Sequence, residues 1–286
     1  MKKILLALSL GTLLATGAYA QTPLGDLTGT GAVSYESQYV FRGKKLANSS
    51  IQPKAEIGLQ PLSLPNTNLY IGAWSNQPVS PRQTTPVTIQ HDEIDLYGGV
   101  YYNTPLNLAL DVGGTYYWYP ESAGAAPAPT KFGPTLSHTY EGYVGLLYNT
   151  AQWFSGVNLN PAVYYYHDFV LDQNVIEISA KTTWDLTNVV GFSGLSLEPR
   201  IFGGVLQANK AFGDTAGPNW KNGYVYYGAG MDLNYMISPY CYLFGNVNYA
   251  GNRDGKTGAP AIIGGDPQYG GTPNSVWFGA GLKFRK

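Results

Sequence analysis

The chain has 286 residues, of which 17 are basic and 18 acidic, giving a formal charge of −1. Charged residues make up only 12% of it, about half the share usual in soluble domains, while tyrosine and glycine are abundant. The balanced charge gives no reason to expect nucleic acid as a partner. After residue 20, no run of 18 apolar residues predicts a transmembrane helix. These features favour a membrane barrel made of strands.

Residues 1–20 are predicted to be a Sec-type signal peptide. Two lysines precede an apolar stretch at 4–15 that is too short to span a membrane, and Ala18-Tyr19-Ala20 is typical of a cleavage site before Gln21. The remaining residues, 21–286, show no break in composition and are predicted to form one domain with 15 basic and 18 acidic residues. The single cysteine, Cys241, excludes an intrachain disulfide and lies too far downstream to carry a lipid anchor.

Apolar and polar residues alternate with a period of two in many segments, which is the pattern of strands. In the last one, Ser275 to Phe284, the odd and even positions separate into an apolar face and a face of small or charged residues. Short links alternate with long links rich in Pro, Gly and Thr along most of the chain, as in barrels with tight periplasmic turns and long outer loops. The strands are predicted at 30–43, 50–60, 67–77, 91–103, 107–119, 138–149, 155–168, 174–186, 194–207, 222–236, 240–250 and 274–284.

The sequence therefore predicts an all-β protein: a transmembrane antiparallel up-and-down β-barrel of about 12 strands, located in the cell outer membrane of a Gram-negative bacterium. An even number of strands places both ends of the barrel chain on the periplasmic side. Aromatic residues near strand ends, Tyr39, Phe41 and Trp277 among them, are predicted to form girdles at the membrane interfaces.

Residues 34–76 resemble the opening of the TorF-like putative porins. The first predicted strand ends Tyr39-Val40-Phe41-Arg42-Gly43, the second contains Pro53, and the third reads Tyr70-Ile71-Gly72-Ala73-Trp74-Ser75-Asn76. In that family a strand ending Tyr-x-Phe-Arg-Gly precedes a Pro-containing strand and then Tyr-x-Gly-x-Trp-x-Ser-Asn. The resemblance covers about three strands, and it implies a porin-like barrel of unspecified substrate.

The polar face of the strands carries the predicted functional residues. A charge facing lipid at mid-depth costs about 2–4 kcal/mol for Arg or Lys, whereas a wet interior avoids this cost. We expect Glu36 and Lys54 to pair across the first two strands, and an excess of inward acids to favour cations. The residues predicted to line the lumen and set selectivity are Glu36, Arg42, Lys54, Glu56, Glu93, Asp95, Asp111, Glu141, Glu177, Lys181, Asp185, Glu198, Arg200, Asp232 and Lys283. The tyrosines predicted on the same face are Tyr70, Tyr97, Tyr117, Tyr143, Tyr164, Tyr166, Tyr224 and Tyr226.

The resulting hypothesis is a porin-like channel for passive diffusion of small hydrophilic solutes or ions. Its expected partners are outer-membrane lipid, lipopolysaccharide and the barrel-assembly machinery, with no cofactor or metal, and the oligomeric state is left open. One alternative is a structural or surface-interaction barrel with a blocked lumen, because twelve strands lie between side-chain-filled and open barrels. The other is an outer-rim hydrolase using His91, His138 or His167. The preferred prediction is that the protein is not an enzyme, because an acid adjacent to a histidine in a strand points to the opposite face.

Overall fold

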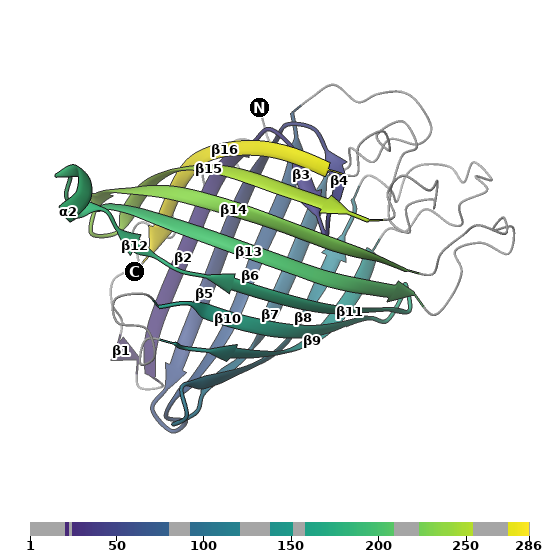
Figure 1. Cartoon of the computed structure of the whole chain (residues 1–286). Helices are drawn as coiled ribbons and strands as arrows, with labels where there is room; N and C mark the ends of the chain where they lie inside the picture. Colours follow the sequence, from purple (N-terminus) through teal and green to yellow (C-terminus); the bar gives the residue numbers. More distant parts are fainter. Residues whose placement is uncertain are drawn as a thin grey trace, which may run out of the picture.

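A closed antiparallel barrel dominates the structure (Figure 1). The computed structural model describes residues 21–22, 25–79, 92–120, 138–150, 158–208, 223–253 and 274–285. Within these residues no helix is long and apolar enough to cross a membrane.

Twelve wall strands follow one another around the barrel, each pairing with the next. The first wall strand pairs with both the second and the last, so the sheet has no free edge. The predicted all-β, up-and-down fold is confirmed. The wall strands are β2 (Gly25–Glu36), β5 (Ser50–Pro61), β6 (Thr67–Pro78), β7 (Glu93–Asn103), β8 (Leu108–Trp118), β9 (His138–Tyr148), β10 (Asn160–Asp168), β11 (Gln173–Lys181), β13 (Leu195–Ala208), β14 (Gly223–Ser238), β15 (Cys241–Asn252) and β16 (Asn274–Arg285).

Four shorter strands and one helix complete the described elements. The strand β1 (Gln21–Thr22) pairs with the start of β2, and β12 (Trp184–Asp185) pairs with β13. The strands β3 (Tyr39–Phe41) and β4 (Lys44–Ala47) pair only with each other, as a small separate hairpin. The one-turn helix α2 (Thr187–Val190) lies in the connection from β12 to β13.

Alternation of residue type along each strand decides which side faces outward. On β8, Leu110, Val112 and Tyr116 are exposed on the outer surface, whereas Ala109 and Asp111 are buried. Most other wall strands likewise present exposed Leu, Ile, Val, Phe or Tyr on that surface. An apolar surface this extensive is unfavourable in water and favourable in lipid, which is the property of a transmembrane barrel.

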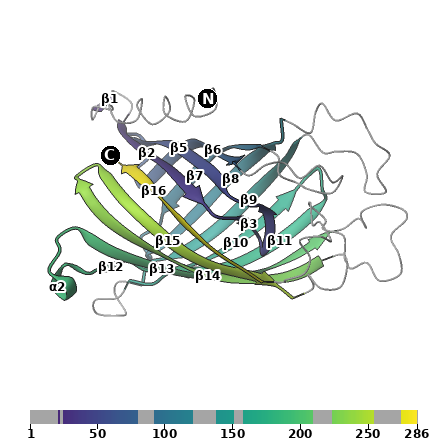
Figure 2. The same cartoon turned by 90° about the horizontal axis from the view of Figure 1, so that it is seen from above.

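The two ends of the barrel differ. Short links such as 62–66, 104–107 and 186–194 lie at one end, called the turn end here, together with the start of β2 and the end of β16. The opposite end, called the loop end, holds the β3–β4 hairpin (Figures 1 and 2). Most of the long links predicted between strands lie outside the described residues.

The first predicted strand, 30–43, is wrong in its second half. The wall strand β2 stops at Glu36, and residues 39–47 leave the wall to form the hairpin. Arg42 has φ 48° and Gly43 has φ 73°, left-handed values that a continuous strand does not adopt. The predicted strand 174–186 is also interrupted, because β11 ends at Lys181 and only Trp184–Asp185 resumes pairing.

Candidate functional site

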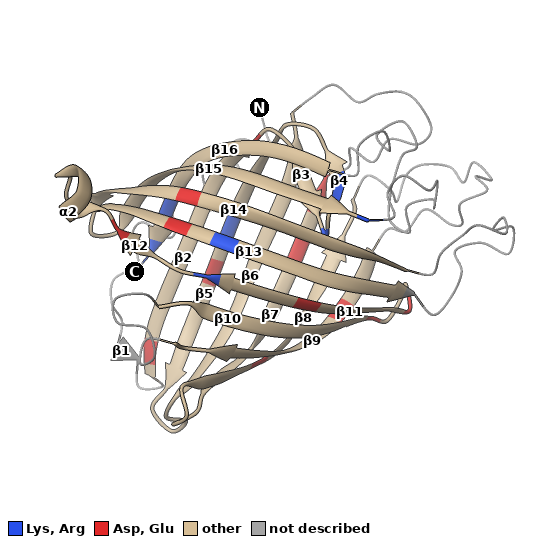
Figure 3. Ribbon diagram, viewed as in Figure 1, with Lys and Arg blue, Asp and Glu red and all other residues tan. Residues whose placement is uncertain are grey.

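The lumen wall carries the candidate site, and its charged residues are spread along the strands (Figure 3). Contacts place most of the predicted lining residues on the inner face, and they divide into three regions. The loop-end region contains Arg42, Glu93, Asp95 and Glu141. A tyrosine-rich region contains the network around Asp111, together with Glu56 and Glu177. The turn-end region contains Arg200, Asp232 and Lys283.

At the loop end, Arg42 anchors the β3–β4 hairpin to the opposite wall. Its Nη1 and Nη2 donate to the two carboxylate oxygens of Glu141 on β9, at 2.8 Å and 2.9 Å. The guanidinium also lies 4.7 Å from the ring centroid of Phe41 and 4.9 Å from that of Tyr166. The paired side chains are only 9% and 3% exposed, so this is a buried, bidentate ion pair. Arg42 is thus inside the barrel as predicted, but on the hairpin rather than on a wall strand.

The backbone at the hairpin tip fits closely against the last wall strands. The side-chain amide of Asn252 donates to the carbonyl of Gly43 at 2.8 Å. A Cβ added at Gly43 would lie 2.5 Å from the carbonyl oxygen of Gly251, so glycine permits both this close approach and the left-handed φ. The hairpin is therefore held by side-chain and backbone contacts on two sides of the lumen.

The second strand of the hairpin contacts the wall through Lys44. Its Nζ lies 4.3 Å from the ring centroid of Tyr224, and burial lowers the pKa of this lysine, which is not on a wall strand, to about 8. A small pocket separates the hairpin from the wall. Its lining residues are Phe41, Arg42, Lys44, Leu46, Gln173, Leu206 and Tyr224.

Tyr39 lies inside the lumen, not in the outer aromatic girdle that the sequence predicts. It is 8% exposed, and its ring centroid is 5.2 Å from that of Trp74, whose register partner Asp95 faces the lumen. Trp277 was also predicted in the girdle. It pairs in register with Asn248, which faces the lumen, and its neighbour Phe278 faces outward.

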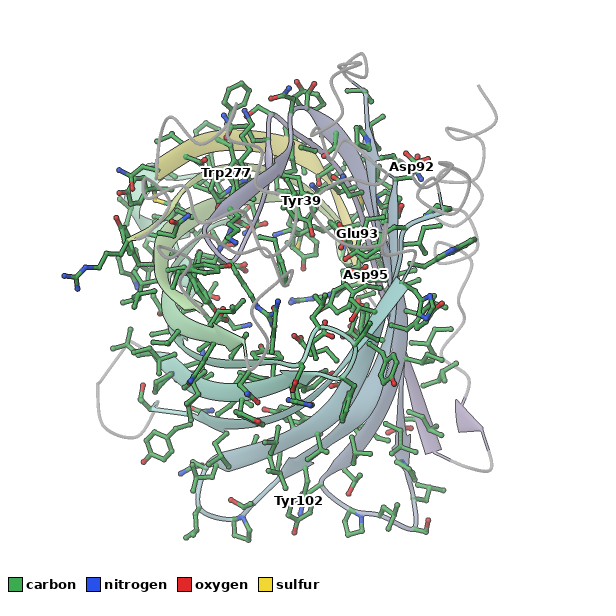
Figure 4. All side chains as sticks on the ribbon, turned by 90° about the vertical axis from the view of Figure 1, so that its right-hand side faces the viewer. Tyr39, Asp92, Glu93, Asp95, Tyr102 and Trp277 are labelled. Carbon is green, nitrogen blue, oxygen red and sulfur yellow. The ribbon has the colours of Figure 1, made fainter. Side chains whose placement is uncertain are left out.

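Glu93 and Asp95 lie two residues apart on β7 and face the loop-end lumen. They are 5% and 9% exposed, and Tyr39 is hydrogen-bonded to Glu93. Viewed from the loop end, the two acids sit next to each other on the wall, near Tyr39 (Figure 4). Neither forms an ion pair with any Lys or Arg in the described part of the chain.

Tyrosine hydroxyls converge on Asp111, which lies on the lumen face of β8 near the turn end of that strand. Tyr70 and Tyr164 donate to its two carboxylate oxygens at 2.6 Å and 2.8 Å, and Tyr70 is also 2.5 Å from the hydroxyl of Tyr143. The predicted tyrosine-rich inner face is therefore present. The network cross-links three strands besides that of Asp111.

Glu56 and Glu177 are also bound by tyrosines. Tyr97 donates to Glu56 at 2.9 Å, and Tyr226 donates to Glu177 at 2.8 Å. Lys54 is 3.7 Å from Glu56, and both side chains are partly exposed.

Two bases share one acid toward the turn end. Arg200 and Lys283 contact the two carboxylate oxygens of Asp232 at 2.7 Å and 2.8 Å, and Arg200 also donates to Asn248. Asp232 pairs in register with Asn246, whose amide donates to Glu36 at 3.0 Å. This side of the lumen is thus a connected polar network.

The predicted Glu36–Lys54 pair is wrong. Both side chains face the lumen, but Glu36 is opposite Ser50 in the register, and Lys54 is opposite Ala32. The four-residue offset separates them along the strands, and Glu36 takes the amide of Asn246 across β16 instead.

Of the remaining predicted lining residues, Lys181 and Glu198 face the lumen and Asp185 does not. Lys181 and Arg200 are register partners, and Glu198 pairs with Asp232, which places all of them on the inner face. Asp185 lies at the turn end in β12, where it accepts the backbone N–H of Thr187 at 2.8 Å. The hydrogen bonds from Thr187 lower the pKa of this exposed carboxyl. It supports the turn rather than the lumen wall.

Sequence reasoning missed the asparagines of the lumen. Asn246 and Asn248 bind Glu36 and Arg200, Asn234 accepts from Lys283, and Asn252 binds the hairpin. The available signal was the even spacing of three of them along β15, since it places Asn246, Asn248 and Asn252 on one face. The described contacts of the histidines differ: His167 contacts Asn174 and the ring of Phe169, the ring of His138 stacks on that of Tyr116, and His91 lies outside the described residues.

Comparison with known proteins gives one family match. A family model described as a bacterial protein of unknown function (Gcw_chp) matches residues 20–160. No curated protein matches the chain.

Solved structures with a similar fold are outer-membrane proteins of low sequence identity. The NanC porin is 10% identical with a TM-score of 0.45, covering 90% of this chain and 98% of its own. An outer membrane channel from Pseudomonas putida F1 is 11% identical with a TM-score of 0.49, covering 94% and 98%. LpxR from Salmonella typhimurium is 11% identical with a TM-score of 0.49, covering 89% and 99%. At such identities the likeness concerns the fold alone.

Proposed function

We propose that the chain is a porin-like channel of the outer membrane that passes small hydrophilic solutes or ions by passive diffusion, with a preference for cations. The resemblance of residues 34–76 to TorF-like porins is part of this proposal. So are the location in a Gram-negative outer membrane after removal of residues 1–20, and contact with lipid, lipopolysaccharide and the assembly machinery.

The charge pattern of the lumen carries the proposal. All bases that form ion pairs in the described residues use Glu56, Glu141 or Asp232. The other inward acids with described contacts have no basic partner among these residues. They accept hydrogen bonds from amides or tyrosine hydroxyls, or have a carboxylate oxygen without a partner in the described chain; they are Glu36, Glu93, Asp95, Asp111 and Glu177. A low-dielectric wall with an excess of one sign of charge concentrates counter-ions, and rings of carboxylates favour cations in pores.

A reversal potential tests this proposal. Refolded protein in a planar bilayer under a KCl gradient is expected to give a cation-selective sign, weakening as the Debye length falls from about 10 Å at 0.1 M to about 3 Å at 1 M salt. Replacing both Glu93 and Asp95 by their amides should reduce the selectivity. An anion-selective potential, or no effect of the double replacement, would contradict it.

A barrel with a blocked lumen is the second candidate, and the hairpin is the observation that favours it. Arg42 crosses the loop-end lumen to Glu141, and Tyr70 and Tyr164 meet at Asp111 farther in. Absence of single-channel current from correctly folded protein would support this second function over the first. A hydrolytic function has less support, because His167 binds an amide rather than a carboxylate. We infer a protein without enzymatic activity.

A further inference from the structure

Asp95 is a buried carboxylate between two aromatic side chains. In the register it lies directly between Trp74 of β6 and Tyr117 of β8, so all three side chains share the lumen face. Asp95 is 9% exposed, and its Oδ1 has no hydrogen-bond partner in the described part of the chain. A buried carboxylate oxygen without a partner carries a desolvation cost that a bound donor would offset.

Glu93 provides a second carboxylate beside that of Asp95. It is on the same face of β7, two residues from Asp95, and is hydrogen-bonded to Tyr39. Tyr39 in turn packs against Trp74. Two neighbouring buried carboxylates disfavour each other's charged form, and no described Lys or Arg is paired with either. A cation at this point would interact favourably with both.

Arg42 shows which kind of cation this part of the lumen accepts. Its guanidinium combines a bidentate carboxylate, Glu141, with the faces of two aromatic rings, Phe41 and Tyr166. Glu93 and Asp95 with Trp74, Tyr117 and Tyr39 repeat this combination of acids and aromatic rings without a cation of the described chain. Within the described residues there is no cluster of three or more His, Cys, Asp or Glu residues suited to a metal ion.

We propose that Glu93 and Asp95, flanked by Trp74, Tyr117 and Tyr39, form a binding subsite for organic cations that carry a guanidinium or ammonium group. The carboxylates supply charge and hydrogen-bond acceptors, and the aromatic faces supply cation–π contacts. Tyr39 is hydrogen-bonded to Glu93 from the base of the hairpin, so a solute reaches the carboxylates as the hairpin shifts. The inference deepens the proposed function, because it assigns cationic organic solutes as the class that such a channel would select.

Ligand-observed NMR on the refolded full chain in detergent tests the site without requiring ion conduction. The probes are methylguanidinium and its neutral, similarly shaped analogue methylurea, at constant ionic strength. We expect saturable binding of methylguanidinium and none of methylurea. The double variant E93Q/D95N should bind at least tenfold more weakly. Trp74→Leu, which keeps both acids, should bind more weakly than the native chain.

Glu198→Gln is the matched control, because it removes another inward acid for which the structure shows no hydrogen bond or ion pair in the described chain. Its affinity for methylguanidinium should stay within about twofold of the native value. The subsite would be overturned if methylurea bound equally well or if the native chain did not bind methylguanidinium. Unchanged affinity in E93Q/D95N, or an equal loss of affinity in E198Q, would also overturn it. A barrel that conducts cations without binding the probe contradicts only this inference. One that binds the probe without conducting contradicts only the channel function.

Discussion

Breaking the Arg42–Glu141 ion pair should release the hairpin from the lumen wall. Glu141→Gln keeps the size of the side chain but removes the charge that compensates a guanidinium whose side chain is only 9% exposed. Removing one partner of a buried ion pair typically costs about 3–5 kcal/mol, because the remaining charge stays buried and unpaired. If docking weakens by about 3 kcal/mol, the undocked population rises about 150-fold.

Cysteine labelling measures this population directly. Leu46 lines the pocket between the hairpin and the wall, so Leu46→Cys in a Cys241→Ser background reports on undocking. When closing is fast relative to labelling, the maleimide reaction rate follows the undocked fraction. With Glu141→Gln we expect labelling to accelerate by at least tenfold, and the single-channel conductance to increase as the hairpin leaves the lumen.

Lys54→Met is the control for this experiment. Its partner Glu56 is 3.7 Å away, and the side chains are 46% and 31% exposed, so the pair contributes at most about 1 kcal/mol. Neither side chain has a hydrogen bond or ion pair to the hairpin in the described chain. Labelling of Leu46→Cys should be unchanged in Lys54→Met. Equal labelling rates and conductance in the native chain and Glu141→Gln would refute the assignment of this ion pair as the hairpin's anchor.

Three further predictions concern packing, hydrogen bonding and pH. Gly204→Ala places a Cβ 2.5 Å from the ring of Tyr226 and should lower the free energy of unfolding by about 1–3 kcal/mol. At Gly203 the nearest atom to an added Cβ is 3.5 Å away, so Gly203→Ala should have little effect, and equal unfolding midpoints for the two variants would contradict this. Asp111→Leu leaves two tyrosine hydroxyls without their acceptor and should destabilise the barrel by about 1–3 kcal/mol per hydroxyl, with Asp111→Asn milder in the same unfolding assay. Burial lowers the pKa of Lys44 to about 8, so above that pH the undocked hairpin binds more protons than the docked one. Docking should therefore strengthen, and labelling of Leu46→Cys should slow, as the pH rises from 8 to 10. Faster hairpin opening over this range, after correction for thiol ionisation, would contradict this prediction.

The sequence alone determined the barrel and which residues of each wall strand share a face. Alternation is a local property, because successive residues of a strand point to opposite faces whatever their partners are. For this reason Asp111, Glu177 and Asp232 could be placed on the inner face before any pairing was known. The existence of the twelve wall strands followed from the same pattern.

Only the tertiary structure decided which inward groups meet. Arg42 and Glu141 are 99 residues apart, and they come together because the chain leaves the wall after Glu36 and the closed barrel brings β9 opposite the hairpin. The left-handed backbone at Arg42 that permits this turn has no signal in the alternating pattern. Likewise, the four-residue offset between Glu36 and Lys54 depends on strand register. The alternating pattern does not fix this register, because shifting a strand by two or four residues keeps every side chain on the same face.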